Sequence, residues 1–307
     1  MTGFWCDAAG QTSAAPSLRN AERVPLCDTI ANPDGTCIVA PVLTRVARDG
    51  EPVHYTSPLL TAAGVRHAFS TRIGGVSPPP FDSLNLGNPA GDMQDEWSRI
   101  YENYRRLQSA IFCPSLDRLW VHQVHGAGVT VARRDADFEC GRRADAIVCD
   151  DPTRLAAVRT ADCLPVLIAT TDGGVVAAVH AGWRGVIAGV VPAAILAMQS
   201  IRSMQPASLL AAIGPGIGPD AFEVGPEVVG AFQARFPGKP FVRPRGDGSR
   251  STIDLPAAVA WQLKEAGLTD RQIDRADLCT LTRQDEFFSH RRDRGVTGRM
   301  AAMIAAR

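Results

Sequence analysis

Cysteine and histidine side chains stand at the ends of two neighbouring apolar runs in RTADCLPVLIATTDGGVVAAVHAGWRG, residues 159–185. Cys163 comes just before PVLIAT, and His180 closes VVAAV. A further histidine, His125, lies beside a glycine in VHQVHG. Polar side chains at strand ends next to glycine turns often build sites, because the loop lets a ligand approach closely. These three residues are therefore the first candidates for chemistry.

Three interpretations of this set are open. A single cysteine is more often a small core residue than a ligand, and a strand-end histidine can be satisfied locally. A Cys163 thiolate with a histidine base would instead form a hydrolase nucleophile. Two imidazoles and one thiolate also suit Zn²⁺ with its fourth position open, an arrangement that lowers the pKa of a bound water to roughly 7. The wide separation of the three residues matches no short zinc-finger pattern, so spacing alone does not choose.

The composition excludes several classes of protein. The 307 residues carry Lys+Arg 32 and Asp+Glu 32, whereas nucleic-acid-binding proteins normally have a basic excess. With 45% hydrophobic residues the chain can bury a sizeable core, and no uncharged apolar stretch is long enough to span a membrane. The eight cysteines follow no regular spacing and the first residues lack a secretory pattern. We therefore expect a cytoplasmic protein with neither nucleic-acid nor membrane partners.

The elements that would position these residues are mostly short strands. Residues 1–54 show weak periodicity, which predicts a partly ordered extension with a strand within 34–43. Apolar runs predict strands over 65–72, 119–126, 128–132, 144–150, 155–162, 165–170, 175–180 and 208–214. Helical spacing predicts helices over 93–111, 185–203, 226–236 and 255–267, and Asp92 is the expected N-cap of the first. The segment 293–307 is expected to end in a short helix. Consecutive strands with few intervening helices favour a mixed or antiparallel α+β fold.

Seven blocks of the sequence resemble the YfiH-type laccase-domain family. They occur in order from about Tyr55 to Arg307: HAFSTRIGGVSPPPFDSLNLG, QVHG, ADAIV, RTADCLPVLI, VHAGWRG, IGPGIGPDAFEVGPEV and FFSHRRDRGVTGR. Members of this family were long labelled multicopper polyphenol oxidases and are now described as purine nucleoside phosphorylases. The resemblance implies a single catalytic domain over 55–307, built of layered mixed β-sheets flanked by helices. It also implies that the metal ligands are His125, Cys163 and His180.

The resemblance also implies that the protein is a zinc-dependent purine nucleoside enzyme. Such an enzyme phosphorolyses adenosine, inosine, guanosine and methylthioadenosine and deaminates adenosine, with purine nucleosides and phosphate as its partners. We expect a monomer or a weak homo-oligomer. The alternative is a Cys–His amidase acting in peptidoglycan precursor editing, a process in which some relatives are implicated. A four-copper polyphenol oxidase needs more imidazoles than six histidines supply, although copper could occupy the same three ligands.

Further candidate residues lie in the same blocks. Asp162, next to Cys163, is a candidate catalytic residue that would orient a ligand or move protons. Arg72 stands beside a glycine-rich turn suited to binding an anion. The expected contacts to substrate or phosphate are Arg72, Asn85, Glu223 and His290.

Two features depart from the simplest pattern. His122 lies three residues before His125 and would face the opposite way in an extended segment, so we expect a structural role for it rather than ligation. Residues 220–222 read Asp-Ala-Phe where many relatives have Cys-Cys-Tyr, and His290 stands where relatives often have Tyr. These substitutions leave the metal ligands unchanged and alter the expected pocket.

Overall fold

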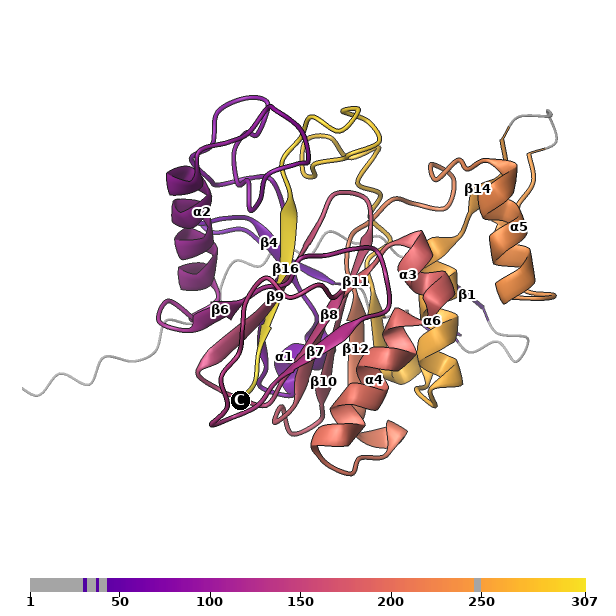
Figure 1. The fold of residues 1–307 in the computed structure, drawn as a ribbon, viewed down its shortest axis with the longest axis horizontal. Helices are drawn as coiled ribbons and strands as arrows, with labels where there is room; N and C mark the ends of the chain where they lie inside the picture. The colour runs from indigo at the N-terminus through magenta and orange to yellow at the C-terminus, as the bar shows by residue number, and fades with distance from the viewer. Residues whose placement is uncertain (1–29, 32–36, 39–42, 246–249) are drawn as a thin grey trace, which may run out of the picture.

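Two six-stranded sheets pack face to face, and helices cover the outer face of each, in a computed structural model of the chain (Figure 1). The structure describes residues 30–31, 37–38, 43–245 and 250–307. A strand covered on both faces appears in sequence as a continuous apolar run, and β10 (Leu164–Thr170) is buried at every position. The expected α+β fold of layered mixed sheets flanked by helices is confirmed.

The first sheet has the strand order β15–β12–β10–β11–β8–β7. Its strands are β7 (Val129–Ala132), β8 (Ala146–Cys149), β10, β11 (Val176–Ala181), β12 (Leu209–Ile213) and β15 (Ile273–Arg275). β11 is antiparallel to both β10 and β8, and β7 is parallel to β8. The starts of β7, β8 and β10 therefore meet the end of β11 at one edge.

The second sheet has the order β3–β4–β5–β16–β9–β6. Its strands are β3 (Thr44–Val46), β4 (His54–Thr56), β5 (Arg66–Ser70), β6 (Asp117–Leu119), β9 (Arg154–Thr160) and β16 (Met300–Ala305). Part of the expected extension, 44–54, thus takes part in this sheet. The strand expected within 34–43 coincides with β2 (Cys37–Ile38), which pairs with β1 (Ile30–Ala31). The loose segment expected before residue 30 lies outside the described residues.

The C-terminal segment is a central strand, so the prediction of a short helix there is wrong. β16 lies between β5 and β9, and all six of its residues are buried. Alanine and methionine favour helices in isolation. That preference is weak, and a segment buried on both faces is decided by its packing and its strand partners.

Helices cover the two outer faces of the sheets. They are α2 (Trp97–Ala110), α3 (Trp183–Ala188), α4 (Val190–Ile201), α5 (Pro226–Arg235) and α6 (Leu255–Glu265). The short α1 (Pro58–Ala62) instead contacts β5 and β12, and its buried Leu60 belongs to the core between the sheets. A small ribbon, β13 (Val242–Arg243) with β14 (Thr252–Ile253), lies beside α5. α2 lies against the second sheet, and α3, α4 and α6 lie against the first (Figure 1). No helix within the described ranges is long and apolar enough to cross a membrane.

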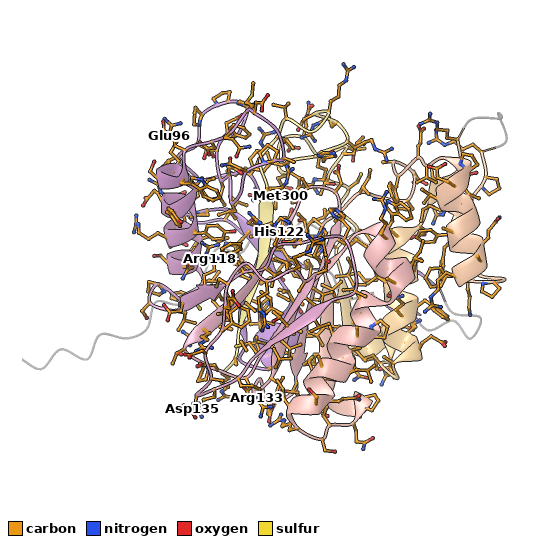
Figure 2. All side chains as sticks on the ribbon, in the orientation of Figure 1. Glu96, Arg118, His122, Arg133, Asp135 and Met300 are labelled. Atoms are coloured by element: carbon orange, nitrogen blue, oxygen red, sulfur yellow. The ribbon has the colours of Figure 1, made fainter. Side chains whose placement is uncertain are left out.

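Two helix boundaries differ from the expected ones. α2 begins at Trp97, so its N-cap is Glu96 rather than Asp92 (Figure 2). The single helix expected over 185–203 is divided into α3 and α4 at Gly189, whose φ of 83° lies in the left-handed region that favours glycine. The break lets α3 turn away from α4 and pack beside the end of β11.

Candidate metal centre

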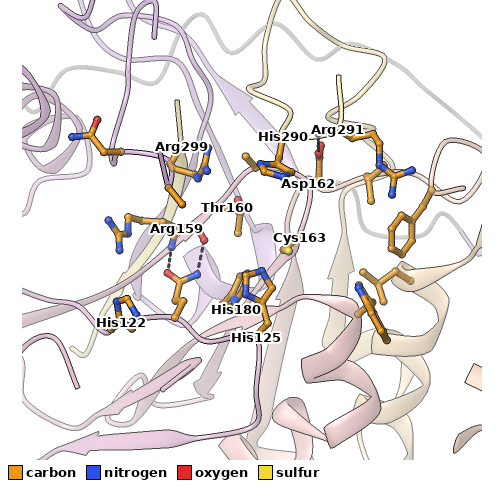
Figure 3. A pocket seen from close by; sticks show the side chains of 18 residues that line it. His122, His125, Arg159, Thr160, Asp162, Cys163, His180, His290, Arg291 and Arg299 are labelled. Carbon is orange, nitrogen blue, oxygen red and sulfur yellow. Dashed lines mark hydrogen bonds between the residues drawn. The ribbon is translucent and has the colours of Figure 1, made fainter. Parts of the chain in front are cut away.

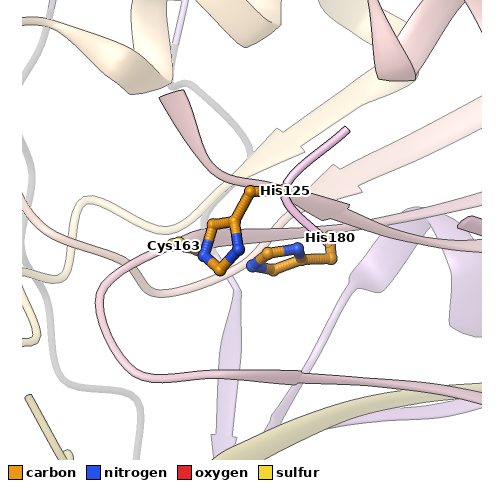
Figure 4. Close-up of side chains that lie close together, drawn as sticks. All are labelled: His125, Cys163 and His180. Atoms are coloured by element: carbon orange, nitrogen blue, oxygen red, sulfur yellow. The ribbon is translucent and has the colours of Figure 1, made fainter. Parts of the chain in front are cut away.

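His125, Cys163 and His180 converge at the edge where β8, β10 and β11 meet (Figure 4). One ring nitrogen from each histidine and the cysteine Sγ all lie within 4.8 Å of one another. The two imidazole rings stand edge to face, with centroids 4.9 Å apart. Cys163 immediately precedes β10 and His180 lies near the end of β11, so the antiparallel register brings them together. Two imidazoles and a thiolate fit a zinc ion that keeps one position for another ligand.

His125 reaches this point from a loop, and the strand predicted over 119–126 is wrong. Regular pairing ends with β6, followed by a single bridge between His122 and Arg143. His125 has a φ of 59°, in the left-handed region, which no strand residue adopts. Because the segment is not extended, the expected opposite orientation of His122 does not apply.

A residue that the sequence analysis does not single out, Asp145, organises both histidines. Its carboxylate accepts hydrogen bonds from the backbone N–H groups of His125 (2.9 Å) and Gly126 (2.7 Å). The same carboxylate accepts from Nδ1 of His180 at 2.8 Å. An ionised carboxylate only accepts, so Nδ1 carries the proton and Nε2 keeps its lone pair for a ligand. The available signal was the ADAIV block, in which an aspartate precedes a buried strand.

The charges within the cluster favour the thiolate form of Cys163. Burial by itself would raise the pKa of Cys163, but the facing imidazoles of His180 and His125 lower it to about 6. Burial would lower the pKa of His180, whereas the thiolate and the Asp145 carboxylate raise it. A thiolate is the form that binds metals and attacks electrophiles.

Gly182 is required by close packing at the cluster. A Cβ at this position would lie 3.0 Å from the Cys163 Sγ and 3.0 Å from Cδ2 of His125. Gly185, one turn into α3, would likewise bring a Cβ within 2.8 Å of the Gly126 carbonyl oxygen. Both glycines of VHAGWRG therefore let α3 approach the loop that carries His125.

A cavity of about 490 Å³ opens beside the three residues (Figure 3). Apart from them it is lined by Asn88, Ala90, His122, Gln123, Arg159, Thr160, Ala161, Asp162, Trp183, Ile217, Phe222, Leu255, His290, Arg291 and Arg299. The lining therefore combines an apolar, partly aromatic wall with several basic side chains. Of the residues expected to contact substrate, His290 lies at this cavity.

Asp162 lies at the cavity with both carboxylate oxygens already bonded. Oδ1 accepts from the Thr280 hydroxyl at 2.7 Å, and Oδ2 accepts from the Arg291 backbone N–H at 2.7 Å. Its φ of 88° bends the chain between β9 and β10, which belong to different sheets. Asp162 therefore holds the C-terminal loop against the site.

Arg72 does not line the cavity. Its guanidinium donates to the carbonyl and the carboxylate of Asp82 and to the carbonyl of Gln284. It also stacks over the Phe288 ring, 4.7 Å from the ring centroid. Because these contacts use the guanidinium to join two loops, Arg72 is a clamp in the fold rather than the expected anion contact.

Asn85 and Glu223 also lie outside the cavity lining. Asn85 is completely buried; its Nδ2 donates to Asp95, and its Oδ1 accepts from the Arg299 backbone N–H. Glu223 forms an ion pair with Arg245 at 2.7 Å. The structure brings neither side chain to His125, Cys163 and His180, because internal partners already hold both.

Known proteins resemble this chain over most of its length. The sequence profile of the family described as "Multi-copper polyphenol oxidoreductase laccase" matches residues 66–307. A Shigella flexneri protein named purine nucleoside phosphorylase YfiH is 44% identical over 241 residues, which cover 78% of this chain and 93% of the relative. The Escherichia coli protein of that name is 43% identical over the same shares. The crystal structure of YlmD from Geobacillus stearothermophilus, 31% identical, superposes with a TM-score of 0.77 over 87% of this chain and 99% of YlmD.

Proposed function

This chain belongs to the family described as multi-copper polyphenol oxidoreductase laccase, and from that membership and the site we propose that it is a zinc-dependent purine nucleoside enzyme. Its reactions would be phosphorolysis of adenosine, inosine, guanosine and methylthioadenosine, and deamination of adenosine. The observation that carries the proposal is the convergence of His125, Cys163 and His180 beside a cavity with one apolar wall. Relatives at 43% and 44% identity are named purine nucleoside phosphorylases.

The cavity has the size and the lining that a nucleoside requires. Its volume of about 490 Å³ lies within the range usual for small-molecule sites. Trp183, Ile217, Phe222 and Leu255 supply apolar and aromatic surface suited to the face of a purine ring. Phe222 keeps this surface without the hydroxyl of the tyrosine found in many relatives.

The residues that would hold zinc are His125, Cys163 and His180. When bound, the ion supplies Lewis acidity beside the substrate. Asp145 fixes the ring of His180 and the backbone of His125, so their positions do not depend on the substrate. The C-terminal loop, held by Asp162, places His290 at the cavity, where its imidazole can hold a proton for the departing group.

A second candidate function has its own structural support. Cys163, His180 and Asp145 stand in the order of a thiol, an imidazole and an orienting carboxylate, which is how a cysteine hydrolase activates its nucleophile. This order fits the amidase alternative. His125, however, is unnecessary in such a triad and is needed in a metal site, so the zinc assignment explains one more residue.

The six histidines of the chain are too few for a four-copper oxidase. Within the described part of the chain, His125, Cys163 and His180 are the one cluster of three potential ligands. His54 and His67 are buried, with ring nitrogens bonded to the backbone carbonyls of Pro52 and Val65. Copper at the three zinc ligands remains an outcome that metal analysis would identify.

The test is an assay of the purified protein by chromatography. Each of the four nucleosides is incubated with and without phosphate. We expect free base and a sugar 1-phosphate only when phosphate is present, and inosine from adenosine in either condition. Absence of turnover with every nucleoside would overturn the proposal.

Metal removal separates the candidate functions. We expect a chelator to abolish turnover and one equivalent of zinc to restore it. A cysteine hydrolase would survive chelation and would be inactivated by thiol alkylation, and hydrolysis of amide substrates would be its activity.

The cytoplasmic location, the oligomeric state and the division into 1–54 and 55–307 stay predictions.

A further inference from the structure

Arg159 and Arg299 present charges to the cavity, and neither forms an ion pair with a carboxylate of the described chain. The Arg159 side chain makes no hydrogen bond or ion pair with any described residue, and Arg299 donates only through Nη1, to the carbonyls of Thr297 and Gly298. Both side chains are partly buried and line the cavity. Figure 3 shows the two arginines together on one side of Cys163, with Arg291 on the other side.

The two arginines are neighbours because β9 and β16 are antiparallel neighbours in the second sheet. Thr160, the last residue of β9, pairs with Met300, the first residue of β16. Arg159, the last residue but one of β9, therefore lies close to Arg299, which directly precedes β16. The second sheet supplies this basic pair, whereas the first sheet supplies Cys163 and His180.

Backbone contacts hold both arginines in place. The Gln123 side chain accepts from the Arg159 N–H at 2.8 Å and donates to its carbonyl at 2.7 Å, as the dashed lines in Figure 3 mark. Asn85 accepts from the Arg299 N–H at 2.9 Å. The anchored backbone fixes the point from which each side chain reaches the cavity. The buried Asn85 thus acts on the cavity through Arg299.

The charges of Arg159 and Arg299 favour a bound anion at this side of the cavity. Burial and the charge of Arg159 lower the pKa of Arg299, and these effects outweigh the opposite effects of Cys163 and Asp162. The carboxylate that lines the cavity, Asp162, accepts from the Thr280 hydroxyl and the Arg291 backbone N–H and forms no ion pair with either arginine. Two partly buried like charges repel each other and lose hydration, a cost that a bound oxyanion removes. Guanidinium groups also match the geometry of phosphate oxygens.

We propose that Arg159 and Arg299 form the phosphate subsite of this cavity. The assignment rests on the proposed function, and it replaces the phosphate contact expected from Arg72. The purine then lies on the opposite side, against Phe222. The guanidinium carbon of Arg291 lies 5.5 Å from the centroid of the Phe222 ring. C1′ of the nucleoside comes between the two groups.

The chemistry of phosphorolysis agrees with this orientation. A phosphate oxygen forms a bond to C1′ while the bond from C1′ to the purine nitrogen breaks. The bonding electron pair leaves with the purine, which takes up one proton, and the sugar leaves as its 1-phosphate. The two arginines position the attacking anion, which removes much of the entropic barrier.

The experiment compares Arg159→Gln, Arg159→Lys and Arg299→Gln with Arg271→Gln, a control whose side chain is exposed and outside the cavity. Calorimetry measures the binding of inorganic phosphate to the zinc-loaded protein, and kinetics give the KM values for phosphate and inosine. Loss of charge-assisted hydrogen bonds predicts weaker phosphate binding by about tenfold to a hundredfold in both glutamine variants. We expect a smaller loss for Arg159→Lys, and the KM for inosine should change far less than that for phosphate.

A nucleoside 5′-monophosphate arm distinguishes the two sources of the phosphate group. If adenosine 5′-monophosphate competes with inorganic phosphate and loses affinity in the same variants, the subsite takes the nucleotide phosphate as well. If it binds equally to all variants, the subsite takes free phosphate only. Unchanged phosphate affinity in both glutamine variants would overturn the subsite. A wild type that binds phosphate through these arginines and cleaves no nucleoside would overturn the proposed function alone.

Discussion

Asp145 and His180 are joined by two hydrogen bonds, one through the side chains and one through the backbone. Nδ1 of His180 donates to Asp145 Oδ1 at 2.8 Å, and the His180 backbone N–H donates to the Asp145 carbonyl at 2.7 Å. The backbone bond extends the pairing of β8 with β11 by one step. Ring orientation and strand register are therefore set together, before any ligand arrives.

We expect Asp145→Asn to weaken zinc binding by about tenfold to a hundredfold, the usual effect of losing a carboxylate behind a ligating histidine. Asparagine has one acceptor oxygen, whereas the Asp145 carboxylate accepts from His180 on one side and from the N–H of Gly126 on the other. An amide NH₂ facing Nδ1 would favour a proton on Nε2, where the metal binds. Titration against a competing chelator measures the affinity.

The control for this substitution is Asp277→Asn, because Asp277 is exposed and forms only a long ion pair of 3.5 Å with Arg275. It should bind zinc as the wild type does. Circular dichroism of both variants checks that the fold is intact. Wild-type zinc affinity in a folded Asp145→Asn protein would contradict the orienting role.

Gly182→Ala should crowd the metal ligands. The added methyl group would lie 3.0 Å from the Cys163 Sγ, so ligands or backbone must move, at a cost of about 1–3 kcal/mol. Zinc affinity, again measured against a chelator, should fall accordingly. Gly230→Ala in α5 is the matched control: a Cβ there has no neighbour within 4 Å, and we expect unchanged affinity and slightly higher helix stability. Equal affinities in the two variants would rule out the packing argument.

Asp162→Asn and Asp162→Ala separate a positioning role from a catalytic one. Asparagine can accept from the Arg291 N–H and donate to the Thr280 hydroxyl, which is able to accept, so the loop stays in place. Alanine removes both bonds, and turnover of inosine should fall by at least about tenfold. Positioning predicts that Asp162→Asn loses less and keeps the shape of the pH profile. Equal inactivation of both variants would assign a catalytic charge to Asp162.

His67 should make stability depend on pH. Burial is the main cause that lowers its pKa from 6.5 to about 4, and Nε2 accepts from the Ser57 N–H. Between these two values the unfolded chain binds a proton that the folded chain does not, so the free energy of unfolding falls as the pH falls from 6.5 to 4. A full shift of this size corresponds to about 3 kcal/mol. Denaturant unfolding at several pH values measures it.

The matched variant is His67→Gln, whose amide oxygen can still accept from Ser57 and does not titrate. Other titrating groups are common to both proteins, so the difference between wild type and variant isolates His67. We expect that difference to change with pH below 6.5 and to be constant above it. A constant difference across the whole range would show that His67 is not the group responsible.

The sequence by itself determined the parts of this protein that depend on residue type and local pattern. β10 and β11 could be predicted because strands buried on both faces appear as continuous apolar runs. Residue type made His125, Cys163 and His180 candidates and left three interpretations open, and the resemblance to the family then implied that they are metal ligands. The seven ordered blocks then selected the family, which the match over 66–307 confirms.

The tertiary structure alone decided which other side chains reach the cavity. Asp145 reaches His180 across two paired strands, and Arg159 meets Arg299 through strand neighbours that are far apart in sequence. Arg72 has a guanidinium of the kind that binds anions, but this group donates to the Asp82 carboxylate instead. β16 has the composition of a helix and lies as a strand between two others. In each case the outcome depends on a partner distant in the chain, and local sequence carries no information about that partner.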